Sequence, residues 1–259
     1  MSNAEEFRAL HHGEKPLLLP NAWDFVSAAA LVAHGFPAIA TTSLGVAAAG
    51  GVPDGEGLAR DETVALAHRL ARLGCLFSLD IEAGFSADPA EVGDLAAELA
   101  GLGAAGINLE DGRPGGTLAD PGRQAELIAA VRSRAPDLFV NARVDTYWLG
   151  EGDPGTTLTR AERYLAAGAD GIFVPGVADE RDIRVFVTEI PAPLNVLFLP
   201  GRHTAGRLAE LGVRRVSTGS LLFRASVHAA VTAAAAFRDG APVPADIPSY
   251  AEIQRLIGD

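Results

Sequence analysis

The sequence predicts an α/β protein folded as one (β/α)8 TIM barrel, and two observations lead to that prediction. The first is a unit that recurs along the chain: a helical pattern ends in glycine, a short β-branched run follows, and a loop rich in Gly, Pro, Asp or Ser comes next. The second is that eight such runs, nearly continuous in apolar residues, fit into 259 residues. Parallel strands covered by helices have this appearance, and this number of units at this length is typical of a TIM barrel.

The predicted elements alternate along the chain. The strands are expected at Leu17–Trp23, Ala38–Ser43, Leu76–Glu82, Gly106–Glu110, Phe139–Asp145, Gly171–Pro175, Leu194–Pro200 and Arg214–Gly219. Helical patterns between them include Asp61–Leu73, Ala90–Leu102, Arg123–Arg134, Leu158–Ala167 and Thr204–Leu211. A left-handed helix C-cap requires a glycine of the kind found at Gly35, Gly74, Gly103, Gly168 and Gly212.

The sequence indicates one domain, with the barrel at about residues 17–240 and an additional C-terminal helical tail at about 241–259. The last barrel helix is expected at Leu221–Arg238 and the tail helix at Ser249–Ile257. A doubly wound open sheet is the alternative, but no G-x-G-x-x-G motif follows the first strand.

Composition excludes several classes of partner. A formal net charge of −12 argues against nucleic acid or an anionic membrane surface as the main partner. No apolar stretch approaches the roughly 20 residues that span a bilayer. The chain has one cysteine, Cys75, and no basic, apolar leader at its start, so we expect a cytoplasmic protein without disulfides.

Acidic residues gather at the ends of two neighbouring strands. Asp80 and Glu82 are two residues apart and are expected on one strand face, and Glu110 ends the next strand. Carboxylates that converge repel one another unless a cation lies between them, and hard oxygen ligands suit Mg²⁺ or, as the alternative, Mn²⁺. The sequence therefore predicts a metal site of Asp80, Glu82 and Glu110. The competing interpretation is that some of them pair with Arg143 or cap loops.

Arg143 ends the fifth strand, with Asn141 and Asp145 on the same face. Its planar fork suits a bidentate substrate carboxylate, or it serves as the counter-ion of Glu110, or both. We expect Arg143 and Asn141 to bind substrate. Lys15 is the only lysine and precedes the first strand, so no lysine is available for a Schiff base or for pyridoxal phosphate. The same sequence predicts no NAD site, and a metal must stabilise the enolate of the substrate.

Five segments together resemble the isocitrate lyase/phosphoenolpyruvate mutase superfamily. They are Pro20–Asp24, Thr42–Val46 with Pro53–Gly55, Leu79–Phe85, Asn108–Asp111 and Asn141–Asp145. The resemblance runs from about Leu17 to about Ser220. It implies a TIM barrel that binds Mg²⁺ and a 2-oxo acid or its enol form.

The resemblance also implies roles for single residues. Asp80 corresponds to the closest metal contact, Glu82 to a companion that is normally aspartate, and Glu110 to the strand-4 glutamate of the family. Ser43, Leu44 and Gly45 look like the turn that binds the substrate carboxylate and enolate oxygen. Asp54 matches an aspartate near the metal, and Arg143 matches the substrate-binding arginine.

The sequence departs from the family at one loop. Lyases of the family carry a gating loop with a catalytic cysteine after the fourth strand, whereas residues 111–118 read DGRPGGTL. The chain thus resembles a methylisocitrate lyase-like or carboxyvinyl-carboxyphosphonate phosphorylmutase-like member that lacks this loop. The reaction we expect is carbon–carbon cleavage or decarboxylation of an oxo-dicarboxylate through a metal-bound enolate. His203, after the seventh strand, is a candidate proton donor or a structural loop residue.

Three alternatives remain open from the sequence. One is phosphoenolpyruvate mutase-type or phosphonopyruvate hydrolase-type phosphoryl chemistry. Another is a phosphate-ester enzyme that uses the glycine-containing loops at 200–206 and 217–220. The third is a barrel that binds an oxo acid without turnover.

The helix expected at Leu221–Arg238 is rich in alanine and has few charges, so more than one of its faces needs a partner. The family resemblance implies that this eighth helix is exchanged between subunits. We therefore expect a homodimer or a tetramer.

Overall fold

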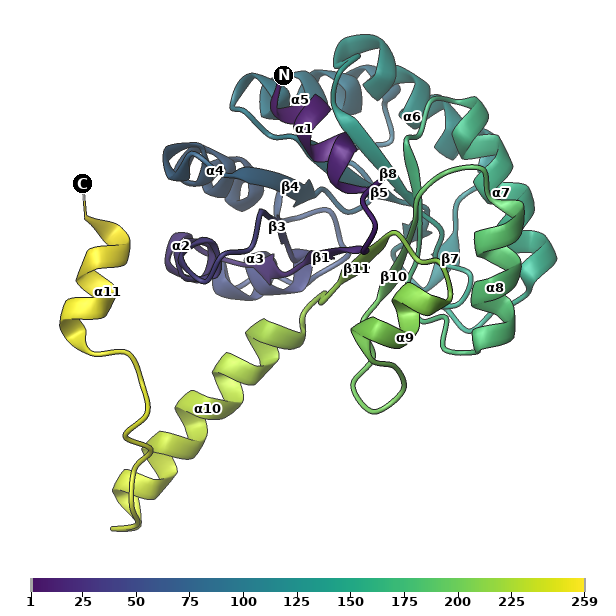
Figure 1. The fold of residues 1–259 in the computed structure, drawn as a ribbon. Coiled ribbons are helices and arrows are strands. Elements are labelled where there is room, and N and C mark those ends of the chain that lie inside the picture. Colours follow the sequence, from purple (N-terminus) through teal and green to yellow (C-terminus); the bar gives the residue numbers. More distant parts are fainter. Residues whose placement is uncertain (1, 259) are drawn as a thin grey trace.

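The computed structural model describes residues 2–258 and shows a closed parallel barrel, which confirms the predicted fold class (Figure 1). The barrel strands are β1 (Leu17–Leu19), β2 (Asn21–Ala22), β3 (Ala38–Thr41), β4 (Leu76–Asp80), β5 (Gly106–Glu110), β8 (Phe139–Arg143), β9 (Gly171–Val174), β10 (Leu194–Leu197) and β11 (Arg215–Ser217). They pair in the order β1-β11-β10-β9-β8-β5-β4-β3-β2.

The expected first strand is divided into β1 and β2 by Pro20, which has no N–H to donate to a neighbouring strand. β1 pairs with β11 on one side, and β2 pairs with β3 on the other. Beyond the proline, the side chain of Asn21 links β2 to the loop after β11. Its Oδ1 accepts the N–H groups of Thr218 and Gly219, each at 2.9 Å. The backbone pairing of β1 with β11 closes the barrel, and this side chain continues the contact beyond the proline.

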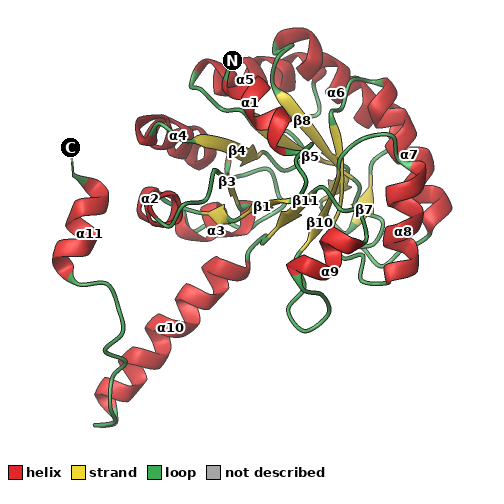
Figure 2. Ribbon diagram, viewed as in Figure 1, coloured by secondary structure: helices red, strands yellow, loops and turns green. Residues whose placement is uncertain are grey.

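Helices surround the strands (Figure 2). They are α2 (Phe25–Ala33), α3 (Ser43–Ala49), α4 (Arg60–Leu70) with a 3-10 turn (Ala71–Leu73), α5 (Pro89–Gly101), α6 (Pro121–Arg134), α7 (Pro154–Ala166), α8 (Glu180–Glu189) and α9 (Ala205–Glu210). Three of them begin with an Asp N-cap followed by proline, at Asp88, Asp120 and Asp153. The five junction glycines all have positive φ, between 59° and 108°, as a left-handed C-cap requires.

The amino-terminal end of the barrel is closed by α1 (Asn3–Leu10). Phe7 of this helix is fully buried and packs edge-to-face on Phe139 of β8, with ring centroids 5.6 Å apart. The next residue after the helix, His11, stacks on the same ring at 4.3 Å. Phe7, His11 and Phe139 form an apolar plug at this end. The opposite, carboxyl-terminal end of the strands remains open for a site.

The last two helices extend away from the barrel. α10 (Leu221–Arg238) projects outward without a buried residue, and α11 (Tyr250–Ile257) returns to lie beside α2 (Figure 1). A short antiparallel hairpin, β6 (Gly112–Arg113) with β7 (Thr117–Leu118), follows β5. Among the described residues, no helix has both the length and the apolar character needed to cross a membrane.

Candidate active site

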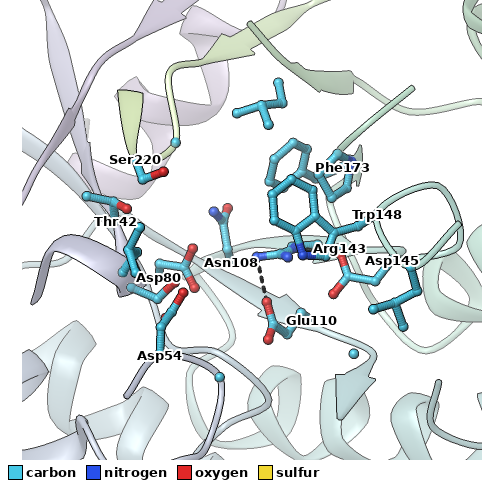
Figure 3. A pocket seen from close by; sticks show the side chains of 18 of the residues that line it. Thr42, Asp54, Asp80, Asn108, Glu110, Arg143, Asp145, Trp148, Phe173 and Ser220 are labelled. Atoms are coloured by element: carbon cyan, nitrogen blue, oxygen red, sulfur yellow. Dashed lines mark hydrogen bonds and ion pairs between the residues drawn. The ribbon is translucent and has the colours of Figure 1, made fainter. Parts of the chain in front are cut away.

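A cavity of about 640 Å³ lies at the carboxyl ends of the strands, where barrel enzymes place their active sites (Figure 3). Residues from most strand ends and following loops line it. Those from the predicted site are Ser43, Leu44, Asp54, Asp80, Glu110 and Arg143. The barrel thus brings these six residues to one cavity from segments far apart in the sequence.

Asp80 is the last residue of β4 and is 8% exposed. Its N–H donates to Thr41 Oγ1 at 2.9 Å, and its Oδ1 accepts the N–H of Glu82 at 3.1 Å. Burial raises the pKa of this carboxyl, and the neighbouring Asp54 raises it further, while Arg143 opposes the shift. A cation bound in the cavity would therefore favour the ionised form of Asp80.

Arg143 is fixed by two carboxylates. Its Nη1 lies 2.5 Å from Glu110 Oε2, and its Nε donates to Asp145 Oδ1 at 2.6 Å. Burial alone disfavours the charged guanidinium, but Glu110, Asp145 and Asp80 together raise the pKa of Arg143 above its usual value. Burial raises the pKa of Glu110 to about 8 against the pull of Arg143. Within residues 2–258, Nη2 of Arg143 has no hydrogen-bond partner, so this edge of the fork is available to a ligand.

Asp54 reaches the cavity from the loop between α3 and α4, and its carboxylate lies beside that of Asp80 (Figure 3). Glu82 does not line the cavity. β4 ends at Asp80, and Glu82 has a left-handed φ of 49°, so the alternation of a strand does not extend to it. Its Oε2 accepts the N–H of Gly57 at 3.0 Å, and burial raises its pKa to about 7. Glu82 thus holds the loop that carries Asp54.

Ser43, Leu44 and Gly45 form the first turn of α3 rather than an isolated turn. The N-cap residue, Thr42, makes no side-chain capping hydrogen bond. The backbone N–H groups of this first turn therefore lack the usual capping partner, and Ser43 and Leu44 line the cavity. Gly45 lies behind them. A Cβ there would stand 2.7 Å from Trp23 Cβ, so glycine is what allows α3 to pack this closely.

Two predicted site residues lie elsewhere. Asn141 is 1% exposed and is not part of the cavity lining; its Nδ2 donates to Asn108 Oδ1 at 2.9 Å. His203 lies in a separate hollow formed with Gly201, Arg202, Thr204 and Arg207. Neither ring nitrogen of His203 has a hydrogen-bond partner within the described chain.

Several lining residues were absent from the predicted site. Arg113 follows β5, but its guanidinium donates to the carbonyls of Glu110 and Gly112 and to Gln124, away from the carboxylates. An apolar wall stands opposite the acidic side, formed by Trp148, Leu149, Phe173, Pro175 and Leu197. The guanidinium carbon of Arg143 lies 5.8 Å from the Trp148 ring centroid and 5.9 Å from that of Phe173. Apolar residues such as those of the wall form no recognisable sequence motif. Only the folded structure shows that they line the cavity.

The donor set limits the kind of metal that fits. In the described part of the chain, no three His, Cys, Asp or Glu side chains are close enough to hold a metal by themselves. The carboxylate of Glu110 pairs with Arg143, and that of Glu82 accepts the N–H of Gly57. Of the acidic residues considered, Asp80 and Asp54 remain as candidate metal ligands. Mg²⁺ commonly binds through one or two carboxylates and completes its shell with water and ligand oxygens, so these residues fit Mg²⁺.

Comparisons with known proteins identify a matching family and similar sequences and structures. A family model described as phosphoenolpyruvate phosphomutase matches residues 7–238. An uncharacterized protein of Mycobacterium tuberculosis (strain ATCC 25618 / H37Rv) is 48% identical over 254 residues, which cover 98% of this chain and 96% of that protein. The 2-methylisocitrate lyase of Bacillus subtilis (strain 168) is 30% identical over 200 residues, or 74% of this chain and 65% of the lyase. The crystal structure of a phosphonopyruvate hydrolase complex with oxalate and Mg²⁺ is 25% identical, covers 99% of this chain and 95% of the hydrolase, and has a TM-score of 0.86.

Proposed function

The chain belongs to the phosphoenolpyruvate phosphomutase family, and from that membership we propose that it is a Mg²⁺-dependent enzyme that cleaves or decarboxylates a 2-oxo acid. Relatives in the isocitrate lyase/phosphoenolpyruvate mutase superfamily are enzymes, among them a lyase and a hydrolase. The observation that carries the proposal is the joint presence, in one cavity, of the Asp80–Asp54 pair and the free Nη2 edge of Arg143.

Each side of the cavity has a part in the chemistry. Asp80 and Asp54 would hold the metal, which supplies Lewis-acid polarisation of the 2-oxo group when bound. Arg143 would bind the substrate carboxylate, and Glu110 and Asp145 keep its fork in place. The N–H groups of Ser43 and Leu44 would stabilise the oxygen on which negative charge develops.

For an oxo-dicarboxylate, the bond between C3 and the distal carboxylate breaks and CO2 leaves. Its electron pair moves onto the 2-oxo oxygen, which gives the enolate of the shorter oxo acid. A proton from water then adds at C3, which gives the shorter 2-oxo acid and hydroxide. No cysteine, lysine or histidine is present in residues 111–118, so this step, which needs no leaving-group acid, suits the hairpin better than cleavage of an isocitrate.

The test is turnover with a defined panel. The protein is incubated with Mg²⁺ and oxaloacetate and pyruvate is followed; phosphonopyruvate with phosphate release tests the phosphoryl alternative. Arg143→Lys keeps the charge but loses the fork, and we expect it to reduce kcat/KM by about 100-fold. Binding of oxo acids without release of any product would show that the barrel is a binding protein and contradict the proposal.

We also propose that α10 is exchanged between the subunits of a homodimer, or of a tetramer built from such dimers. Val227, Val231 and Phe237 on this helix are 48%, 64% and 80% exposed. Leu18 on the outer side of β1 is 42% exposed, at the position that a helix following β11 would normally cover. An apolar hollow of about 380 Å³ between α2 and the start of α10 adds to the uncovered surface.

Light scattering tests this assembly. We expect a dimer or tetramer at micromolar concentration and a smaller species for Val231→Glu. Val243→Glu, which changes an exposed valine beyond the helix, is the matched control and should leave the mass unchanged. A monomeric wild-type protein would contradict the exchange.

A further inference from the structure

The carboxamide of Asn108, on the floor of the cavity, is held from below by two donors. Its Oδ1 accepts Nδ2 of Asn141 at 2.9 Å and Nη2 of Arg215 at 3.0 Å. Asn108 comes from β5, Asn141 from β8 and Arg215 from β11, so the contact joins strands from different parts of the barrel. Figure 3 shows Asn108 between the acidic side of the cavity and Arg143.

This arrangement determines which way the carboxamide faces. A guanidinium only donates hydrogen bonds, so the Asn108 atom facing Arg215 must be oxygen. Arg215 and Asn141 together occupy both acceptor positions of that oxygen. The NH2 group is the other half of the amide. Within residues 2–258 it has no protein acceptor, and Asn108 lines the cavity.

Arg215 itself has an unusual environment. It is fully buried, with Phe7 of the apolar plug beneath it at 5.9 Å, and no carboxylate of the described chain forms an ion pair with it. Its Nε and Nη1 also have no partner there. Burial lowers the pKa of Arg215 to about 9, and the charge of Asp80 only partly opposes that shift. A buried cation without an ion-pair partner is expensive, and such departures from good packing concentrate at functional sites. Among the residues that the structure describes, the one hydrogen bond of the Arg215 side chain is with Asn108.

We propose that Arg215 is a positioning residue of this site, which fixes the Asn108 carboxamide so that its NH2 group donates a hydrogen bond to a ligand oxygen. The inference rests on the proposed function, because it takes the ligand to be a 2-oxo acid or its enolate. Such a ligand presents acceptor oxygens, whereas the ammonium group of a 2-amino acid would meet a donor. Asn108 and Arg215 thus favour the oxo acid over the corresponding amino acid.

The affinity test uses oxalate with saturating Mg²⁺ and isothermal titration calorimetry. We expect Asn108→Ala and Arg215→Met each to weaken oxalate binding by about 10-fold, the loss of one hydrogen bond to a charged ligand. In the Asn108→Ala background, Arg215→Met should have less than about a 2-fold further effect. Arg214→Met, which changes the exposed residue immediately before β11, should bind like the wild type. An undiminished effect of Arg215→Met in the Asn108→Ala background would show that Arg215 acts through its charge alone and overturn the proposal.

Asn108→Asp provides a variant that leaves Arg215 intact should Arg215→Met not fold. A carboxylate still accepts from Arg215 and Asn141 but has no N–H to donate, so oxalate binding should fall at least as far as in Asn108→Ala. Oxalate affinity equal to that of the wild type would overturn the proposal.

A ligand-free measurement separates this inference from the proposed function. The chain has only five asparagines, so selective ¹⁵N labelling gives few side-chain NH2 signals. We expect the Asn108 signals to be sharp in the wild type and broadened in Arg215→Met. Unchanged Asn108 signals would overturn the positioning role even if oxalate binds. Failure of the wild type to bind oxalate would instead reject the proposed function, and the NMR comparison would still decide the role of Arg215.

Discussion

Oε2 of Glu82 accepts the backbone N–H of Gly57 at 3.0 Å and thereby ties the end of β4 to the loop that carries Asp54. The two carboxylates beside each other in the cavity, Asp80 and Asp54, come from the two segments that this contact joins. The family resemblance implies an aspartate at position 82, but the longer glutamate is what spans the distance to Gly57 here. From outside the cavity, Glu82 thus supports the loop of Asp54, a residue of the proposed metal site.

The first prediction concerns this contact. Glu82→Asp shortens the side chain by one methylene, removes the hydrogen bond to Gly57 and leaves Asp54 less well placed. We expect about a 10-fold loss of Mg²⁺ affinity, as is typical when a group that supports a metal ligand is changed. Glu82→Gln keeps an acceptor oxygen at the same reach and serves as the control. Calorimetric titration with Mg²⁺ measures both, and equal affinities for Glu82→Asp and the wild type would contradict this role.

The second prediction concerns Asp80 and the stability of the metal-free protein. Its pKa is raised by burial, so the ionised carboxylate reduces stability in the absence of a cation. Asp80→Asn removes that charge, and we expect the free energy of unfolding of the metal-free protein to increase by about 1 kcal/mol. The same variant should lose the rise in melting temperature, roughly 5–10 °C, that Mg²⁺ at about 100 times Kd gives the wild type.

Asp61→Asn is the matched control, because Asp61 lies on α4 with its side chain 93% exposed. It should retain the Mg²⁺-dependent rise. An Asp80→Asn variant that is still stabilised by Mg²⁺ would place the metal elsewhere.

The sequence predicted most of the barrel because strand and helix periods are local. The sequence also predicted that three side chains share one end of the barrel, those of Asp80, Glu110 and Arg143. Each of them ends a parallel strand, and the carboxyl ends of such strands meet at one face of the barrel. Glu82 was placed on the same face as Asp80 by assuming that the strand continued. The backbone instead turns into the left-handed region at Glu82, and no residue pattern announces that change.

Contacts across the barrel could not be predicted from the sequence, for a different reason. In the sequence, Arg215 is the second of two consecutive arginines at the start of a predicted strand. The sequence does not show which of the two faces outward. Its contact with Asn108 joins positions 107 residues apart, and it depends on the closure and stagger of the barrel. The apolar wall of Phe173 and Leu197 likewise becomes visible only when separate strand ends face one cavity.

The third prediction concerns that wall. A cavity of about 640 Å³ with one apolar side leaves room beyond a small oxo acid, so an oxo-dicarboxylate with a methyl group at C3 should have a higher kcat/KM than the unsubstituted acid. Burial of one methyl group corresponds to about a 4-fold preference. Leu197→Asn should abolish this preference at little change of volume. Leu58→Asn, an exposed leucine outside the lining, should keep it, and equal rates for both acids in the wild type would contradict the prediction.

The last prediction concerns His11, which stacks on Phe139 at the amino-terminal end of the barrel. Burial, with the nearby Arg215 charge, lowers the pKa of His11 to about 3. Its Nδ1 lies 2.8 Å from the Phe7 carbonyl, which can only accept, so the proton is on Nδ1 and Nε2 has no partner within the described chain. Below pH 6.5 the unfolded chain binds a proton at His11 that the folded chain does not, so stability falls as the pH decreases toward 3.

From pH 7 to pH 5, His11 should lower the free energy of unfolding by about 2 kcal/mol. Urea denaturation at several pH values measures the slope. Glu82 and Glu110, with pKa values raised to about 7 and about 8, also titrate near this range, but they are present in every variant, so the difference between slopes isolates His11. His11→Phe keeps a ring against Phe139 but cannot titrate, so its change in the free energy of unfolding from pH 7 to pH 5 should be more favourable than that of the wild type by this amount. His12→Asn changes the exposed neighbour and should keep the wild-type slope. Equal slopes for His11→Phe and the wild type would mean that His11 takes up its proton in the folded protein as readily as in the unfolded chain.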